Sequence, residues 1–508
     1  MISNRKLAAA AGAILCALGA TLGAAPALAA PEDFGAKIDY LVADAVAATT
    51  GGQCGKAVND RIKAALADPR LDGLEPARRE GLYYIALECG GYVGPDAVAS
   101  ATKLDAVATK PYLKAVANLV LLIDARTRKD APAAVAAFDK VFAAEPAALN
   151  DVRIFVYYQM LRLLDDDPAT RLRVVSKLRA APWTGADEID AARNDWALIQ
   201  AQLAADAGDL PQAKAALEKA DDPAVLLSAA EDRRFAPLWP ALEKAGRFDW
   251  IPLAQARLAM IEARSAAEPR ALRHVQDRID ALRALGRFDD AVALGADYDR
   301  RLLRNQAFDD ADERAPWVLN SYAYALAEVG RIDDADKIMA RATGDDTVSQ
   351  RINRAEMLIT AGRPAAALAV LETVETKHAS PFGLLWLASN RACALAATPA
   401  DPRIAADLAK LRDGWKENPS ALTQALLCLG RDDEAAALYI RRLEDPTLRR
   451  SALEAFRKTK APPAQSDHVR AFLARRDAIL SRPDVLAVQG KYGRVVTAPL
   501  SGVYWGDL

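Results

Sequence analysis

One short pattern recurs through the second half of this 508-residue chain and constrains its fold more than any other feature. A glycine is followed five residues later by an alanine, and in most copies Asp or Glu lies between them. Glycine accepts the left-handed conformation that ends a helix, and acidic residues favour the first turn of the next helix. The alanine is small enough for two helices to touch. The pattern therefore predicts a series of helical hairpins, with copies at Gly208, Gly286, Gly330, Gly362 and Gly430.

The spacing of the copies sets the size of each hairpin. With a degenerate copy at Gly246, which lacks the alanine, the steps from Gly208 are 38, 40, 44, 32 and 68 residues. The last step fits two hairpins, and the intermediate one turns near Pro399. Alanine, the best helix former, dominates the apolar residues, which make up 52% of the chain. We therefore expect an all-α protein in which hairpins stack side by side.

Three of these segments share more than the glycine. The repeats that begin at Asn194 and Val348, and the one that turns at Gly330, place alanines where the two helices of a hairpin meet. These alanines are Ala201, Ala213, Ala220, Ala323, Ala335, Ala342, Ala355 and Ala367. The arrangement resembles the tetratricopeptide repeat over residues 194–443. The resemblance implies an α–α superhelix of degenerate hairpins, in which the first helix of each hairpin, helix A, lines a concave groove.

The first 29 residues have the features of a cleaved signal peptide. Arg5 and Lys6 precede the uncharged stretch Leu7–Ala25, and Ala27-Leu28-Ala29 fits the rule for a cleavage site, so we place the cut after Ala29. An uncleaved membrane anchor is the alternative, since the stretch is long enough to span a bilayer. No later segment is apolar enough to do so. The bacterial character of the leader predicts a periplasmic protein and leaves association with the outer membrane open.

Four cysteines remain after cleavage. Cys54 and Cys89 are 35 residues apart, and so are Cys393 and Cys428, which is about the length of one hairpin. Because neighbouring repeats place equivalent positions side by side and the periplasm is oxidising, we predict the disulfides Cys54–Cys89 and Cys393–Cys428. Four buried free thiols are the alternative. The cysteines lack the Cys-x-x-Cys spacing and nearby histidines of a zinc site.

The chain divides into a signal peptide (1–29), an N-terminal helical region of degenerate repeats (30–192), the repeat array (193–482) and a C-terminal cap or tail (483–508). We take the N-terminal region as a continuation of the same superhelix. The alternative is a separate helical domain that ends near Trp183-Thr184-Gly185. Helices are expected in this region at Phe34–Ala48, Gly55–Leu66, Pro76–Cys89, Tyr112–Thr127, Ala133–Ala144, Val152–Leu164 and Ala169–Leu178.

The end of the chain differs in composition. Val485–Leu508 contains four glycines and a Val495-Val496 pair, so we expect a short hairpin or an extended tail. Such a segment either caps the last repeat, whose apolar face needs cover, or acts as a docking peptide through Tyr504 and Trp505.

The sequence gives little sign of catalytic chemistry. The 66 basic residues balance 68 acidic ones, so we expect no nucleic-acid partner. The histidines His274, His378 and His468 lie far apart, and we expect them at the surface. Nucleophile, nucleotide and metalloprotease motifs are absent from the sequence, as is the Glu-Ser pair of the lytic transglycosylases, which also carry a long α-superhelix. We expect no catalytic residue, cofactor or metal ion, and a protein that is not an enzyme. Four tryptophans are assigned to the core: Trp183, Trp196, Trp239 and Trp250.

The resemblance also implies which side chains face the groove. Asn side chains there can hold an extended peptide backbone, and Trp317 and Tyr324 can anchor apolar groups. An ordinary solvated helix face is the alternative. The groove candidates are Arg273, Gln276, Asp280, Arg283, Trp317, Asn320, Tyr324, Asn353, Glu356 and Asn390.

We therefore expect a periplasmic scaffold that binds other envelope proteins or extended peptides and serves envelope assembly or secretion. A glycan- or peptidoglycan-binding accessory protein and a cell-wall enzyme with an unrecognised site are the alternatives.

Overall fold

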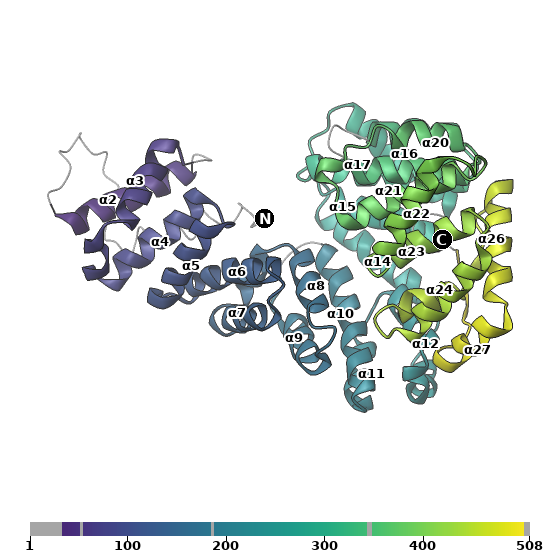
Figure 1. The fold of residues 1–508 in the computed structure, drawn as a ribbon, viewed down its shortest axis with the longest axis horizontal. Helices are drawn as coiled ribbons and strands as arrows, with labels where there is room; N and C mark the ends of the chain where they lie inside the picture. The colour runs from purple at the N-terminus through teal and green to yellow at the C-terminus, as the bar shows by residue number, and fades with distance from the viewer. Residues whose placement is uncertain (1–32, 51–53, 184–186, 343–347, 502–508) are drawn as a thin grey trace. The chain divides into compact units, whose positions relative to one another are not determined.

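The computed structural model describes residues 33–50, 54–183, 187–342 and 348–501, and the predicted signal peptide lies outside these ranges (Figure 1). The described chain is helical apart from two short strands, β1 (Lys458–Lys460) and β2 (Thr497–Ser501), so the all-α prediction is confirmed. It divides into two compact units, residues 1–203 and 204–508.

The first unit contains every helix that the sequence predicted there, with ends shifted by a few residues. A proline in the first turn starts several of them, because its fixed φ suits a helix and its missing N–H has no partner at that position. The helices are α2 (Phe34–Thr50), α3 (Lys56–Leu66), α4 (Pro76–Gly90), α5 (Pro95–Val107), α6 (Pro111–Thr127), α7 (Ala131–Ala144), α8 (Ile154–Arg162), α9 (Pro168–Ala180) and α10 (Asp187–Asp206), the last of which continues into the second unit.

Helix α5 is the one that the sequence analysis did not expect. It begins at Pro95 after Gly94, whose φ is 105°. Ala97, Ala101 and Leu104 recur at helical spacing and are buried. The proline and the spacing of the buried residues are the sequence features that could have predicted α5.

The second unit is the stack of hairpins. Helix A comes first in each hairpin and is followed by a second helix, helix B. The helices before the main stack are α11 (Leu210–Glu218), α12 (Pro223–Glu231), α13 (Trp239–Lys244) and α14 (Trp250–Ala267). The A and B helices of the main stack are α15 (Arg273–Ala284) and α16 (Phe288–Leu303), α17 (Ala311–Glu328) and α18 (Ile332–Ala342), α19 (Val348–Thr360) and α20 (Pro364–Leu371), α21 (Pro381–Ala394) and α22 (Pro402–Asp413), and α23 (Pro419–Cys428) and α24 (Asp432–Glu444).

The predicted glycines make the turns between helices A and B. Gly330 has a φ of 84° and donates its N–H to the Ala327 carbonyl, while the next N–H, of Arg331, reaches back to Leu326. These two bonds form the Schellman motif, which satisfies carbonyls at the end of a helix. The glycine needs this left-handed conformation. The same pair of bonds occurs at Gly286, Gly362 and Gly430.

The predicted alanines lie inside the hairpins. All eight alanines that carried the resemblance are buried. Helix A of each hairpin packs against helix A of the next, from α15 through α17, α19 and α21 to α23, and each helix B packs against the following helix A. The predicted superhelix of stacked hairpins is therefore confirmed, including the hairpin that turns near Pro399, between α21 and α22.

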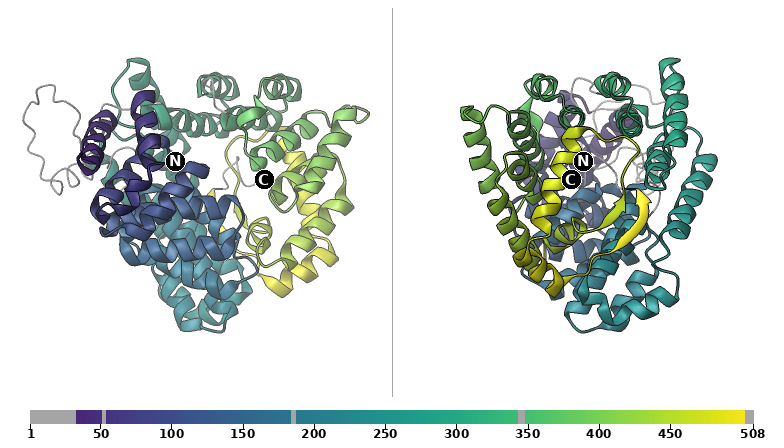
Figure 2. Two further views of the ribbon diagram at one scale, coloured as in Figure 1. Left: turned by 60° about the vertical axis from the view of Figure 1, so that its left-hand side comes forward. Right: turned by 90° about the vertical axis from the view of Figure 1, so that its right-hand side faces the viewer.

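After α24 the chain turns back across the stack in a segment that we name the strap, residues 445–501. It contains α25 (Arg449–Glu454), β1, α26 (Asp467–Leu480), α27 (Pro483–Tyr492) and β2. Helix α26 packs on α19, α23 and α24, while β2 packs on α14 and α15. In the right-hand view of Figure 2, these yellow elements lie between the green and the teal helices of the second unit.

The strap corrects the expectation for the end of the chain. Residues 483–492 form helix α27, which packs on α24, where a hairpin or tail was expected. Strand β2 pairs in parallel with β1, so the two strands are not a hairpin. The local sequence could not show this, because the partner of β2 lies far away in the chain. Tyr504 and Trp505 lie outside the described residues.

Both predicted disulfides are present. Cys54–Cys89 ties the segment before α3 to α4, with Cα atoms 5.2 Å apart. Cys393–Cys428 ties α21 to α23, two neighbouring A helices, with Cα atoms 5.1 Å apart. In the described ranges, no helix combines the length and the apolar composition needed to cross a bilayer.

Candidate functional site

All ten predicted groove residues lie on A helices. Four are on α15, three on α17, two on α19 and one on α21. Hydrogen bonds and ion pairs join most of these residues into a line that runs from one helix A to the next, which we name the polar row. Its members are Asp280, Arg283, Asn320, Ser321, Tyr324, Glu328, Asn353, Glu356, Asn390 and Gln424. Gln276 and Trp317 are half-buried and take no part in these bonds. Arg273 instead bonds to Glu268 near the start of α15.

An ion pair holds α15 to α17 at one end of the polar row. Arg283, only 3% exposed, donates from Nε and Nη2 to the two oxygens of Glu328, both at 2.8 Å, and Glu328 is fully buried. Nη1 donates to Asp280 at 2.8 Å, and the guanidinium lies 5.3 Å from the centre of the Tyr324 ring. Burial alone lowers the pKa of Arg283, but its hydrogen bonds to Glu328 outweigh that effect, so the pKa of Arg283 lies above its ordinary value.

Amide side chains continue the row from α17 to α23. Asn353 donates to the Asn320 carbonyl oxygen at 3.0 Å, which joins α19 to α17. Asn390 donates to the Ile352 backbone carbonyl at 3.2 Å. Asn390 in turn accepts from Gln424 of α23 at 2.9 Å. These bonds fix the register of four neighbouring A helices.

Glu356 is the member of the row whose pKa lies close to neutral pH. It is buried, and burial raises its pKa to about 7, against a hydrogen bond from Asn390 that lowers the pKa. A carboxyl group in this state carries a proton near neutral pH and can donate a hydrogen bond.

The sequence analysis did not identify three members of the row, Gln424, Glu328 and Ser321. Ser321 donates a hydrogen bond to Asp280 at 3.2 Å. Gln424 lies six residues before Gly430, and Asp280, Tyr324 and Glu356 lie at the same offset from their own glycines. That regular offset was a signal that could have found Gln424.

A cavity of about 1030 Å³ lies in the second unit, between the hairpins and the strap. Its lining comes from α12, α14, α15, α23, α24, α25, α26, α27, both strands and the loop after β1. Among the predicted groove residues, Asp280 lines this cavity.

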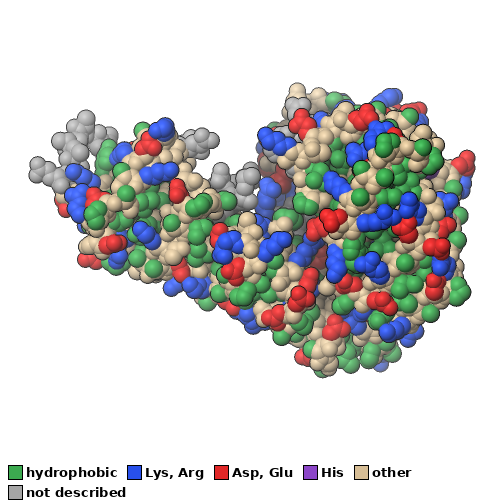
Figure 3. Space-filling view, viewed as in Figure 1, with side chains coloured by type: hydrophobic (Ala, Val, Ile, Leu, Met, Phe, Trp, Pro, Cys, Tyr) green, Lys and Arg blue, Asp and Glu red, His purple; other side chains and the backbone are tan. Residues whose placement is uncertain are grey.

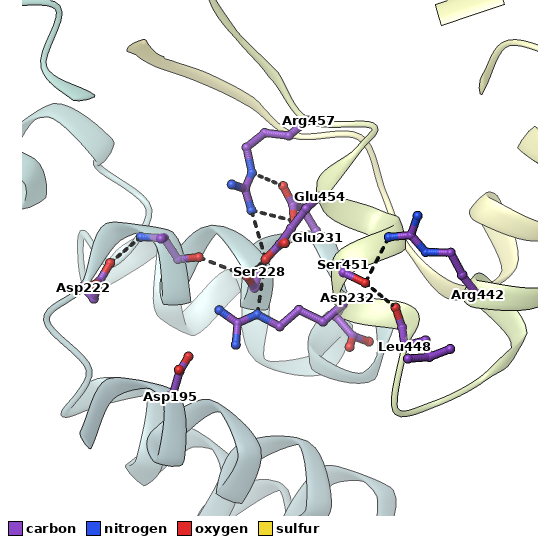
Figure 4. Close-up of polar contacts among 12 residues, drawn as sticks. Asp195, Asp222, Ser228, Glu231, Asp232, Arg442, Leu448, Ser451, Glu454 and Arg457 are labelled. Carbon is purple, nitrogen blue, oxygen red and sulfur yellow. Dashed lines mark hydrogen bonds and ion pairs between the residues drawn. The ribbon is translucent and has the colours of Figure 1, made fainter. Parts of the chain in front are cut away.

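The strap closes one side of the cavity by binding α12 and the turn after it (Figure 4). Arg457 donates to both oxygens of Glu231, at 2.6 and 3.0 Å, and Ser228 donates to Glu454 at 3.0 Å. Glu231 is buried, which raises its pKa, while its bonds with Arg457 oppose that rise. Arg494 donates its backbone N–H to the Glu231 carbonyl at 2.8 Å and stacks over Trp239, with 3.7 Å to the ring centre.

The strap also follows the row of glycine turns. The Ala464 N–H donates to the Glu328 carbonyl at 3.0 Å, and Ser466 Oγ donates to the Thr360 carbonyl. Farther along, Arg475 donates to the Leu427 carbonyl at 3.0 Å. Each of these carbonyls belongs to the last turn of a helix A, where the regular helical bonds end. The Glu328 and Thr360 carbonyls precede the turn glycine by two residues, while the Leu427 carbonyl also accepts the Gly430 N–H at 3.2 Å.

One face of the second unit shows no concentration of one charge. In the face of the second unit seen in Figure 3, basic and acidic side chains are interspersed. Over the residues with a described position, no three His, Cys, Asp or Glu side chains gather so that they could hold a metal ion.

The structure contradicts one prediction for the histidines and places most of the four clustered tryptophans in the core. His274 is buried, and its Nε2 lies 3.3 Å from a carboxylate oxygen of Glu268. The prediction that His274 lies at the surface is therefore wrong, because this part of α15, which includes Val275, packs into the core. His468 is exposed. The His378 side chain lies outside the described part. Trp183, Trp196 and Trp250 are buried, and Trp239 is half-buried beneath Arg494.

Comparison with known proteins addresses the repeats directly. The family described as Tetratricopeptide repeat matches residues 197–219 and 348–373. These ranges fall in the two repeats that the sequence analysis began at Asn194 and Val348. No curated protein matches the chain. Two matches to the repeat family, the Schellman turns at the predicted glycines and the buried alanines together show that the chain is a tetratricopeptide-repeat-like protein.

Proposed function

We propose that the chain is an exported scaffold that binds partner proteins or extended peptides on its A helices and serves assembly or secretion in the bacterial cell envelope. Tetratricopeptide repeats are typical of protein-interaction scaffolds, which supports the binding role. The leader and the two disulfides support export, because disulfides persist in oxidising compartments.

The polar row is the observation that carries the binding role. It fixes neighbouring A helices to one another through buried bonds, so the half-buried Gln276, Trp317 and Asn353 are presented on a rigid support. Binding to a surface that is already ordered loses less conformational entropy than binding to a flexible one.

The alternatives have weaker support. A glycan platform needs exposed aromatic rings, and three of the four clustered tryptophans are buried.

An enzyme needs free acid or base groups in a pocket. In the cavity, Asp280 bonds to Arg283, Asp477 to Arg476 and Glu454 to Ser228, so these acids are already engaged. We therefore propose that the protein is not an enzyme.

The binding role is tested by affinity capture from an envelope extract of the source cell, with the immobilised mature chain as bait. A variant with Gln276→Ala and Trp317→Ala alters the helix A surface and leaves the polar row intact. The matched control, Arg300→Ala with Leu303→Ala, changes exposed side chains on α16. We expect the first variant to lose partners that the wild type and the control retain, as measured by quantitative mass spectrometry. Equal recovery with all three baits would contradict the assignment of the binding face.

Export is tested separately by the N-terminal sequence of the protein recovered from the periplasmic fraction. The proposal predicts a chain that begins at Ala30. Full-length protein in the cytoplasmic fraction would refute export while leaving the binding role open.

A further inference from the structure

A buried arginine lies in the wall of the cavity without a carboxylate partner. Arg442 of α24 is 3% exposed and lines the cavity. Its Nη1 donates to Thr423 Oγ1 at 2.8 Å and its Nη2 to Ser451 Oγ at 3.1 Å, whereas its Nε–H has no hydrogen-bond partner. Throughout the part of the chain that the structure covers, no acidic side chain pairs with it. Figure 4 shows the guanidinium turned toward Ser451 of α25.

Two other arginines of the same unit, one buried and one half-buried, are arranged differently. Arg283 and Arg457 each donate two bonds to a buried glutamate. Arg442 has only neutral hydroxyls, so its charge is poorly compensated, and burial lowers its pKa. A buried charge of this kind destabilises a fold unless a counter-charge or a ligand compensates it. An oxyanion that entered the cavity beside Arg442 would neutralise the guanidinium and accept hydrogen bonds from its N–H groups.

Further cations line the same cavity. Lys458 and Lys460 of β1 are exposed there, and neither forms an ion pair with any described residue. Two of the acids in the lining are engaged, Glu454 by Ser228 and Arg450 and Asp477 by Arg476. Asp280 of the same lining is engaged by Arg283, and Asp222 accepts the Ala224 N–H at 2.8 Å. Arg442, Lys458 and Lys460 are thus cations of the lining that have no acidic partner among the described residues.

Apolar side chains are exposed beside these cations. Leu486 of α27 is 42% exposed and Val495 is 43% exposed, and both line the cavity. They are among the few large apolar side chains of the described chain that are this exposed. The buried Leu227 of α12 and Ile261 of α14 also line the cavity.

We propose that this cavity binds an anionic amphiphile, a small molecule whose carboxylate or phosphate head accepts hydrogen bonds from Arg442 and whose apolar chain covers Leu486 and Val495. The volume of about 1030 Å³ lies at the upper end of the range of small-molecule sites. This site does not depend on the proposed scaffold function, because partner proteins would bind the A helices while the small molecule lies inside the unit.

Isothermal titration calorimetry on the mature chain tests the proposal with five ligands, and the three that have an alkyl chain are kept below their critical micelle concentrations. Laurate and dodecyl phosphate carry head and chain, acetate and inorganic phosphate carry the head alone, and octyl glucoside carries a chain with a neutral head. We expect micromolar binding of laurate or dodecyl phosphate, and the tighter of the two identifies the head chemistry. Arg442→Gln should weaken that binding about tenfold or more, because it removes a charge-assisted hydrogen bond. Arg441→Gln, a change at the exposed neighbour, should leave it unaltered.

Several results would overturn the proposal. Absence of binding by both amphiphiles, equal affinity for the head alone or for octyl glucoside, or unchanged affinity in Arg442→Gln would each do so. Should Arg442→Gln fail to fold, the double variant Leu486→Asp and Val495→Asp provides the test, because both side chains are exposed and their replacement leaves the core intact. It should reduce amphiphile binding about tenfold, and full retention of affinity would refute the site.

Discussion

Removal of the Glu328 charge should loosen the contact between α15 and α17. In Glu328→Gln, the buried Arg283 loses a carboxylate that accepts two hydrogen bonds at 2.8 Å. Breaking a buried ion pair on one side costs about 3–5 kcal/mol, because the other charge stays buried without compensation. Asp280 remains bonded to Arg283 at 2.8 Å and offsets part of this cost. We therefore expect a loss of about 3 kcal/mol, at the lower end of that range.

Native-state hydrogen exchange measured by mass spectrometry is the suitable assay, because the two compact units can unfold separately and a single unfolding curve would mix them. Peptides that cover α15 and α17 should show a free energy of opening lowered by this amount. The matched control is Asp334→Asn, which breaks the exposed pair between Arg331 and Asp334 and should leave exchange unchanged. Equal protection in Glu328→Gln and in the control would refute the reasoning. Replacement of both partners by Met should recover much of the loss, since it leaves no buried charge.

Two further predictions concern Glu356 and the second disulfide. The pKa of Glu356 is about 7 in the folded chain against an ordinary value of 4.5, so the folded state retains a proton that the unfolded chain releases. The contribution of Glu356 to stability is therefore full below pH 4.5 and is lost as the pH rises through 7. The whole loss is about 3 kcal/mol. Glu356→Gln should flatten the pH dependence of α19 protection across that window, and an unchanged slope would contradict the assignment. Replacement of Cys393 and Cys428 by Ala should destabilise the second unit by roughly 3–4 kcal/mol, measured by native-state hydrogen exchange as a lower free energy of opening for peptides from α21 and α23. Unchanged protection of these peptides would show that the bridge does not constrain α21 against α23.

The hairpins could be predicted from the sequence because each depends on local chemistry. Gly330 needs a left-handed turn and Ala335 needs to be small, and both requirements can be recognised within a few residues. The disulfides followed from the length of one hairpin, which places Cys393 and Cys428 at equivalent positions. The repeat period therefore turned local signals into contacts between hairpins.

The strap could not be predicted, because its contacts join residues that are far apart in the chain. Nothing near Arg457 indicates that its partner is Glu231, and nothing near Thr497 indicates a parallel strand at Lys458. Contacts of this kind depend on the path of the whole superhelix.

The groove candidates show a subtler limit of sequence reasoning. Their positions on the A helices followed from the repeat, but the repeat does not reveal whether a polar side chain faces solvent or the next hairpin. Asn320 and Asn390 bond to neighbouring A helices, while Gln276 and Trp317 stay half-buried and take no part in the row. Only the packing distance between hairpins decides between these outcomes.

A crystal structure of the mature chain would test the central claim most directly, namely that glycine-turned hairpins stack through buried alanines and are crossed by the strap. The account predicts left-handed turns at Gly286, Gly330, Gly362 and Gly430 and a contact between Arg457 and Glu231. A central sheet, alanines that face solvent, or a strap detached from α12 would contradict it.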